Sequence, residues 1–532
     1  MTTKRQTRKR HFSRYSQVVM VVAKHRLAKS MQTLGIGHLL PFRWASWFPP
    51  RNPWRKDIYT EPEHVRMAIE ELGTTFVKIG QILSTRVDLL PAEFIVELAK
   101  LQDSLKPVSV EVIKERIRSE LGRPVEDLFA AFDENPIGVA SIGQAHAATL
   151  HDGTEVVVKT RKPEVAEQVE TDLEILHDLA VAATRRQVGP QQYNLIAIVD
   201  EIAEALTLEM DYDREGHSAE HFAKFFMGDP TVHIPKVFWE YSTSRVLTIE
   251  RIRGITIRDT QALEKAEVDR KELAVRCVDI WLKMLFEGVA FHADPHPGNL
   301  FLEPDGRLAL IDFGMVGLVD DEMREHLALA LKGILEGDAD LLVDSLVELG
   351  AVPSRTYDGS REKLRSDLKH FLNLYPNLTV AELAVGVKLE ELFTVIRNNH
   401  IQLPSNTFIL LKTVIMAESL GAGLNPDFVV MPVLEPHIKR LIQRKYSLST
   451  IANRLPGVAG ELAVLGLQLP RRLTRLLKAF EIGEINVRTQ ITGLEQPVNR
   501  LDRLVNRMLL GFLAGSVILA LAILAAVYRP GL

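Results

Sequence analysis

Two stretches near the middle of the chain carry carboxylate and amide side chains at a spacing suited to holding a metal ion beside a phosphate. In FHADPHPGNLF, Asp294 precedes Asn299 by five residues. In LALIDFGMVG, Asp312 follows an apolar run and begins Asp-Phe-Gly. Protein kinases use an Asp and an Asn at this spacing, followed by Asp-Phe-Gly, to orient the acceptor and bind Mg²⁺. The spacing therefore predicts that Asn299 and Asp312 bind Mg²⁺ and that catalytic Asp294 positions or deprotonates an acceptor.

The segment between these stretches favours a phosphotransferase over two other interpretations. LFLEPDGRLALI is typical of two strands joined by a tight turn, and such a hairpin returns both loops to one edge. One alternative is a metal site built on His292, Asp294 and His296. It would need further ligand clusters, but the remaining histidines are scattered. The other alternative, a proline-stiffened turn, does not account for the second stretch.

A nucleotide site is predicted upstream of these loops. Lys159 ends the apolar strand EVVVK, where kinases place the lysine that contacts the α- and β-phosphates of ATP. Ahead of it, PIGVASIGQAH is not G-x-G-x-x-G but still offers backbone N–H groups to phosphates. VLTIERIRG predicts a hinge in which backbone groups of Glu250 and Ile252 bind adenine. The loop residues predicted to bind the nucleotide are Ala140, Ser141, Ile142, Gly143 and Gln144.

With these residues placed, the chain strongly resembles the UbiB-type atypical kinases, the ubiquinone-biosynthesis or aarF-domain family. The resemblance spans about residues 12–330 and rests on the motifs KIGQ, SIGQ, LEMDYDRE, DPHPGN and DFG. It implies a protein-kinase-like fold with ATP and Mg²⁺ as cofactors. It also implies that Glu215 pairs with the catalytic Lys159, although 56 residues separate the two.

The same resemblance assigns roles to the KIGQ and LEMDYDRE motifs. It implies that Lys78 reaches into the active site and is held near Glu209 and Asp211, which regulate access. Gln81 lies three residues after Lys78, so the two share one face of a helix. The chain departs from the family where Ala140 lies in GVAS rather than in an alanine-rich loop. It also lacks A-P-E and an activation segment after the DFG motif, so the platform that other kinases use for peptides is missing.

The two ends of the chain predict contact with a membrane. Residues 1–56 contain thirteen Lys or Arg residues and no acid, a pattern typical of a segment on an anionic membrane surface. A disordered basic tail or an organelle transit peptide would have the same composition. Residues 508–527 are uncharged and long enough to cross a bilayer once, whereas family members often have two such helices. Arginines precede this segment, which predicts that the main domain faces the cytoplasm, at the inner membrane in a bacterium.

The fold class predicted is α+β, a two-lobed protein-kinase-like fold that is mostly helical, with a helical N-terminal extension and a C-terminal transmembrane helix. The net charge of −5 argues against a nucleic-acid partner, and the single cysteine fits a reducing compartment. The predicted domains are a basic segment (1–56), a helical extension (57–132), an N-lobe with inserted helices (133–255), a helical C-lobe (256–500) and the membrane helix (508–527).

The function predicted is that of a membrane-anchored atypical kinase or ATPase that binds Mg-ATP and supports ubiquinone biosynthesis, by ATP hydrolysis or by phosphorylating a small molecule. The alternative is a catalytically silent pseudokinase that binds nucleotide and organises a biosynthetic complex. The partners expected are membrane lipids, quinone-biosynthesis enzymes or phenolic and isoprenoid small molecules, and a second copy of the chain.

Overall fold

The computed structural model describes most of the chain before residue 446. It describes residues 59–84, 86, 90–101, 107–163, 165–185, 194–349, 358–373 and 405–445, with short pieces at 13–18, 20–21, 24–25, 391–392, 394–396 and 399. Within these residues no helix is long and apolar enough to span a membrane. The predicted membrane helix at 508–527 lies outside the described residues.

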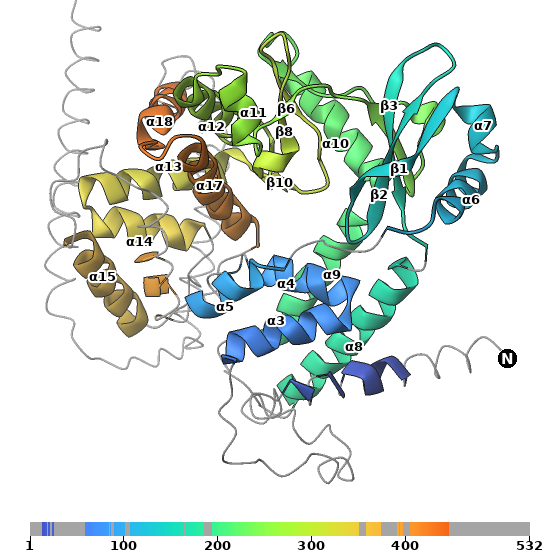
Figure 1. Ribbon diagram of the computed structural model, residues 1–532. Helices are drawn as coiled ribbons and strands as arrows, with labels where there is room; N and C mark the ends of the chain where they lie inside the picture. Colours follow the sequence, from blue (N-terminus) through green and yellow to red (C-terminus); the bar gives the residue numbers. More distant parts are fainter. Residues whose placement is uncertain are drawn as a thin grey trace, which may run out of the picture. The chain divides into compact units, whose positions relative to one another are not determined.

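A four-stranded antiparallel sheet forms the N-lobe, with the strands in the order β1, β2, β3 and β5 (Figure 1). The Asp152-Gly153 turn of HDGTEVVVK is typical of a hairpin, and β2 and β3 form one, in which Gly153 has a φ of +90°, which favours glycine. Along β3 the side chains alternate, so Val156 and Val158 enter a core with the neighbouring helices while Lys159 faces the other way. The strands are β1 Ala131–Val139, β2 Gly143–Thr149, β3 Glu155–Arg161 and β5 Val246–Glu250.

The aromatic and β-branched residues of KVFWEYSTSRVLTIE are typical of two paired strands, but the stretch contains only one named strand. Only its second half is a strand, β5, whereas Trp239–Tyr241 form the 3-10 helix η3. Trp239 is held there because its indole N–H donates to Glu220 of α10 at 2.8 Å. The ring also leaves no room beside Gly216, where a Cβ atom would lie 2.7 Å from the Trp239 ring. Packing against α10 therefore outweighs the strand propensity of these aromatic residues.

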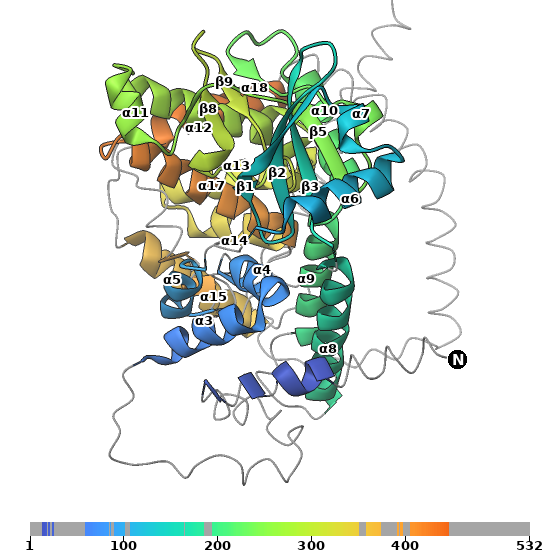
Figure 2. The ribbon, with the colours of Figure 1, turned by 45° about the vertical axis from the view of Figure 1, so that its right-hand side comes forward.

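Helices precede the sheet and are inserted between β3 and β5, as the apolar spacing predicts (Figures 1 and 2). The preceding helices are α3 Glu61–Leu72, α4 Thr74–Leu83, α5 Ala92–Leu98, α6 Val110–Leu121 and α7 Val125–Leu128. The inserted helices are α8 Val165–Arg185, α9 Leu195–Glu209 and α10 Tyr212–Phe225. Helix α4, which carries KIGQ, packs on α3, α5, α8 and α9. One core joins α3, α4, α8 and α9 to Ile142 of the predicted nucleotide loop.

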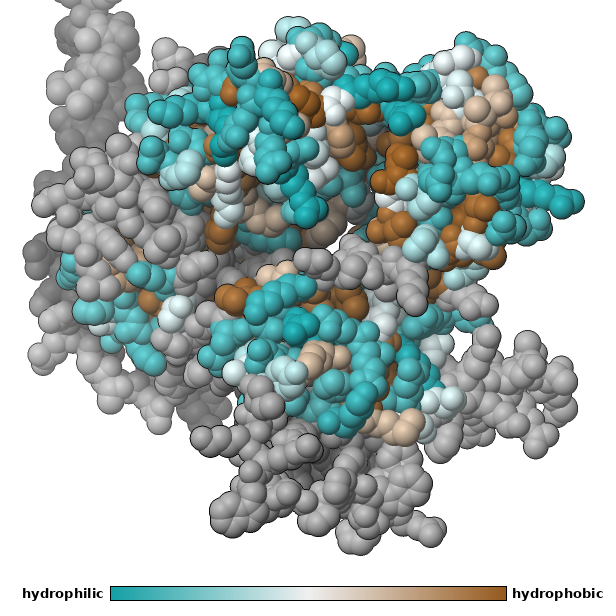
Figure 3. All heavy atoms as spheres, viewed as in Figure 1, coloured by the Kyte–Doolittle hydropathy of each residue, from teal (hydrophilic) through white to brown (hydrophobic). Residues whose placement is uncertain are grey.

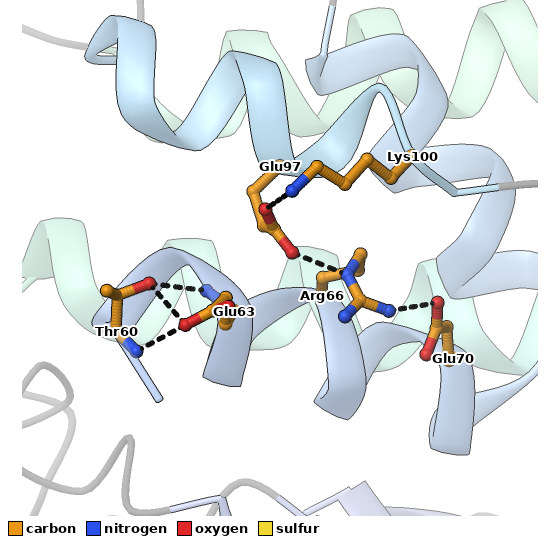
Figure 4. Close-up of polar contacts among 6 residues, drawn as sticks. All are labelled: Thr60, Glu63, Arg66, Glu70, Glu97 and Lys100. Carbon is orange, nitrogen blue, oxygen red and sulfur yellow. Dashed lines mark hydrogen bonds and ion pairs between the residues drawn. The ribbon is translucent and has the colours of Figure 1, made fainter. Parts of the chain in front are cut away.

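Ion pairs fix α3 against α5, and both of these helices pack on α4 (Figure 4). The Arg66 guanidinium donates to Glu70 and to the buried Glu97, each at 2.7 Å. At the start of α3, the Glu63 carboxylate accepts a 2.6 Å hydrogen bond from the N–H of Thr60, whose hydroxyl caps the helix in return. These contacts hold the frame in which α4 presents Lys78.

Part of the basic segment packs on this helical frame. Val18 and Val21 are buried in the core of α3, α4, α8 and α9. Arg14 donates to Asp172 of α8 at 2.6 Å, and Lys24 donates to Glu71 of α3 at 2.8 Å. Arg14 and Lys24 therefore form ion pairs within the protein. Binding of this segment to a membrane would depend on its other Lys and Arg residues.

The described part of the C-lobe is mostly helical, as predicted, and contains two small sheets. Its helices are α11 Thr260–Lys265, α12 Arg270–Glu287, α13 Asp321–Glu336, α14 Ala339–Glu348, α15 Asp358–Asn373, α17 Ser405–Leu424 and α18 Met431–Lys445. Its strands are β4 Val232–His233, β6 Ile255–Thr256, β7 Ala290–His292, β8 Leu300–Leu302, β9 Leu308–Leu310 and β10 Val316–Leu318, and η4 (Pro297–Asn299) precedes β8. Helix α12 is buried along most of its length and carries Cys277, whose thiol pKa is raised to about 12 by burial. Hydrophobic residues also line the hollow between this lobe and the four-stranded sheet (Figure 3).

Candidate active site

Two strand pairs hold the predicted catalytic and metal loops side by side. The loop with Asp294 and Asn299 runs from β7 to β8, and the loop with Asp312 runs from β9 to β10. Strand β8 pairs with β9 and β7 pairs with β10, both antiparallel. The two loops are therefore fixed at both ends, which confirms the hairpin predicted between them.

His292 connects the two loops through both of its ring nitrogens. Its Nδ1 accepts a 3.1 Å hydrogen bond from the N–H of Asp294, and its Nε2 contacts the carbonyl oxygen of Asp312. Nε2 must then be the protonated nitrogen of a neutral ring. Burial lowers the pKa of His292, which agrees with the neutral form. The histidine two residues before the catalytic aspartate is thus a structural link between loops rather than a metal ligand.

The three residues predicted to position the acceptor and the metal converge here. The Asn299 amide donates to the Asp294 carboxylate at 3.2 Å, and the Gly314 N–H donates to Oδ1 of Asp312 at 2.9 Å. Among the described residues, no donor bonds to Oδ1 of Asn299 or to Oδ2 of Asp312. Carbonyl and carboxylate oxygens are the ligands that Mg²⁺ prefers, so these residues fit that ion.

Lys159 and Glu215 form the ion pair that the resemblance implies. Lys159 Nζ lies 2.5 Å from Oε1 of Glu215 on α10, and 3.3 Å from the carbonyl oxygen of Ile311, the residue before Asp312. The two side chains are 18% and 8% exposed. Because β3 is central in its sheet and α10 packs on β5, the pair joins the sheet, the inserted helices and the Asp-Phe-Gly loop.

The carboxylate of Asp312 is held in its charged form. Burial acts to raise its pKa, but the Lys159 ammonium and the Gly314 N–H outweigh burial, and the pKa of Asp312 is lowered. For Lys159, burial acts to lower the pKa, and the carboxylates of Glu215 and Asp312 reverse this and raise it. The site therefore has an ionised aspartate beside a protonated lysine, as a nucleotide-metal site requires.

The predicted nucleotide loop is largely covered in this structure. Ser141, Ile142, Gly143 and Gln144 are all buried, and only Ala140 is exposed. A Cβ atom added to Gly143 would lie 2.0 Å from the hydroxyl oxygen of Tyr212 in α10. No motif in the sequence indicates this contact between the loop and α10. The role of these residues in nucleotide binding stays a prediction.

Gln144 and the carbonyl of Ala140 are occupied by contacts within the protein. The Gln144 amide exchanges hydrogen bonds with the backbone of Val108 at 2.9 and 3.3 Å and contacts His146. The ammonium of Lys162 donates to the Ala140 carbonyl at 2.7 Å. These contacts stiffen the loop. They also hold the Gln144 side chain against the segment that leads into α6.

The predicted hinge follows β5. Glu250 is the last residue of that strand, and its carboxylate accepts from the N–H of Lys236 at 3.1 Å. Within the described chain, neither the N–H nor the C=O of Ile252 has a hydrogen-bond partner. Its backbone groups are therefore not engaged by other described residues, and the role of Ile252 in adenine binding stays a prediction.

The residues of KIGQ and LEMDYDRE have separate contacts. Lys78 forms an ion pair with Glu209, as the resemblance implies. Asp211 forms no ion pair with Lys78; its carboxylate instead caps α10 by accepting from the N–H of Asp213 at 3.1 Å. Gln81 donates to the carbonyl of Leu101 at 3.2 Å. Only Glu209 of the two acids therefore restrains the lysine.

Comparison with known proteins identifies the family. Residues 100–346 match the ABC1 atypical kinase-like domain, and residues 368–429 match the UbiB helical domain. A protein of Xanthomonas oryzae pv. oryzae named Probable protein kinase UbiB is 30% identical over 97% of this chain and 94% of its own length. The chain belongs to the UbiB family of atypical kinase-like proteins. This confirms the predicted family and its kinase-like fold.

Other proteins are similar to this UbiB-family chain over much of their length. The uncharacterized protein sll1770 of Synechocystis is 34% identical over 84% of this chain and 75% of its own length. A solved structure, the complex of Rv3197 with erythromycin from Mycobacterium tuberculosis, is 23% identical and has a TM-score of 0.46, covering 67% of this chain and 90% of that chain.

The UbiB helical domain adds residues to the site that the motifs did not predict. Lys412 of α17 lies within electrostatic range of Asp294 and of Lys78. Further along α17, Met416, Leu420 and Leu424 line a cavity of about 350 Å³ whose other wall includes residues 295–297 of the catalytic loop. No sequence motif includes these positions. The four-residue spacing of Met416, Leu420 and Leu424 is the one signal in the sequence that predicts a shared helix face.

Proposed function

We propose that this UbiB-family protein is a Mg²⁺-dependent ATPase or small-molecule kinase. The observation that carries the proposal is the convergence of an ionised Asp312, the Lys159–Glu215 pair and the Asp294–Asn299 loop on one site. A scaffold that only bound partners would have no need of this charge arrangement. Phosphoryl transfer depends on positioning and electrostatics of this kind.

Each residue has a distinct part in the proposal. Lys159 binds nucleotide phosphates and Glu215 holds the Lys159 side chain in place. Asn299 and Asp312 hold Mg²⁺, which when bound neutralises phosphate charge. Asp294 accepts a hydrogen bond or a proton from water or from a substrate hydroxyl. Two features favour a small acceptor over a peptide. The helices around α4 present Lys78 to the site, and the sequence lacks an activation segment.

The test is ATP turnover by the full chain in detergent or nanodiscs, compared with the variant Asp294→Asn. We expect Mg²⁺-dependent phosphate release by the wild type and a loss of at least about 100-fold in the variant, because a positioned base contributes 10²–10⁴-fold. Nucleotide affinity should change little. Mg-ATP binding without turnover in the wild type would favour the pseudokinase alternative.

The biological setting proposed is isoprenoid-quinone biosynthesis, with quinone-biosynthesis enzymes or phenolic and isoprenoid molecules as partners. Membership of the UbiB family supports this setting. The matching experiment expresses the chain in a bacterium lacking its own family member and measures quinone by extraction. Recovery by the wild type and not by Asp294→Asn supports both the setting and the need for chemistry. Equal recovery by both would point to a scaffold.

We also propose that residues 508–527 anchor the protein in the membrane, with the main domain on the cytoplasmic side. The support is the uncharged length of this segment and the arginines before it. A chain ending at Asn506 should be released largely by salt from the membrane fraction, whereas the full chain should require detergent. A truncated chain that still requires detergent would place the anchor elsewhere.

A further inference from the structure

Helix α17 faces the catalytic loop along one side. Residues Met416, Leu420 and Leu424 recur every four positions and line the cavity beside Pro295–Pro297. Lys412 lies one turn earlier at the same spacing, so its side chain belongs to the same face. The helix also packs on α12, which leads to the catalytic loop, and on β10, which follows Asp-Phe-Gly. Lys412 therefore lies on the side of α17 that faces the catalytic loop, within electrostatic range of Asp294.

The charges around Lys412 do not balance. Among the described residues, no carboxylate lies within 4 Å of its ammonium; the facing charges are Asp294, which attracts it, and Lys78, which repels it. Some of the side chain reaches solvent, yet burial lowers the pKa of Lys412, with Asp294 opposing that shift. A desolvated cation without an adjacent partner costs free energy. Such a cation is a site for an anion that binds between it and the catalytic loop.

The position limits which anion this is. Lys159 already serves the nucleotide phosphates near β3, and Lys78 is paired with Glu209. Lys412 instead lies on the side of Asp294, where the acceptor would meet the transferred group. We propose that Lys412 is a further catalytic residue, which contacts the terminal phosphate of bound ATP from the helical domain. This inference rests on the proposed function only in that ATP occupies the site.

The experiment compares the affinities of Mg-ATP and Mg-ADP for the full chain by calorimetry. Lys412→Met removes the charge and keeps an apolar stem, whereas Lys412→Arg keeps the charge. Lys439→Met, on the exposed face of α18, is the matched control. We expect Lys412→Met to weaken ATP binding about tenfold or more, as loss of a charged hydrogen bond does, while ADP binding changes less than about twofold. The Arg variant should recover most of the difference.

Each outcome tests the role of Lys412 independently of whether the protein hydrolyses ATP. An ATP-specific loss supports it even if the wild type hydrolyses nothing, a result that would overturn only the proposed phosphoryl transfer. Equal losses for ATP and ADP would mean that Lys412 supports the fold, and unchanged affinities would mean that it contacts no phosphate; either overturns the inference. Thermal unfolding of the variant checks that it folds, and Lys412→Gln, which also removes the charge but keeps a polar end, gives the same decision if the Met variant does not fold.

Discussion

Replacing Asp312 with Asn should abolish Mg²⁺-dependent nucleotide binding and leave the fold intact. The side chains have nearly the same shape, and the Asn oxygen can still accept from the N–H of Gly314, which now bonds to Oδ1. What the variant loses is the negative charge of the Asp312 carboxylate, which the Lys159 ammonium and the Gly314 N–H stabilise. A divalent cation loses its only charged ligand among those proposed, so we expect Mg-ATP affinity to fall at least about 100-fold.

The control for this variant is Asp305→Asn, in the exposed turn of the same hairpin. That carboxylate bonds to Arg307 and faces away from the loops that meet at Asp312. Nucleotide affinity measured with and without EDTA should fall only for Asp312→Asn, and both variants should unfold near the wild-type temperature. Unchanged Mg²⁺-dependent affinity in Asp312→Asn would remove Asp312 from the metal site.

The central part of the site could be predicted from the sequence because local rules determine it. The spacing from Asp294 to Asn299 lies within one loop, and a tight turn at Asp305-Gly306 fixes how the next strand returns. Lys159 likewise follows from the alternation of one strand. Helical spacing of apolar residues also accounts for the helices inserted between β3 and β5, which were predicted as part of the N-lobe.

Other features depend on contacts that no local pattern contains. Gln144 was predicted to meet the nucleotide, yet its amide is drawn to the backbone of Val108, a segment ahead of the sheet. Asp211 was placed near Lys78, but an acid directly before a helix satisfies the free N–H groups of that helix. Trp239 has a strand-forming side chain that packs on α10 instead. In each case a tertiary contact or a cap competed with the motif.

Removing Glu215 should destabilise the protein strongly as well as impair nucleotide binding. Glu215→Ala leaves the ammonium of Lys159 buried, 18% exposed, with its 2.5 Å partner gone. Breaking a buried pair in this way costs about 3–5 kcal/mol, because an uncompensated charge remains. Asp312 lies near enough to attract the freed ammonium, which places the expected loss toward the lower end of that range. Denaturant unfolding of the solubilised full chain measures it.

A double variant separates the stability of the pair from its function. In Lys159→Met with Glu215→Leu no charge of the pair is left buried, so most of the stability should return, since apolar replacement of a buried ion pair is often neutral or stabilising. Nucleotide binding should stay lost, because the phosphate-binding cation is absent. Recovery of stability without recovery of binding would show that the pair is kept for its action on the nucleotide. A double variant as unstable as Glu215→Ala would instead make the pair a structural requirement of the joint between β3 and α10.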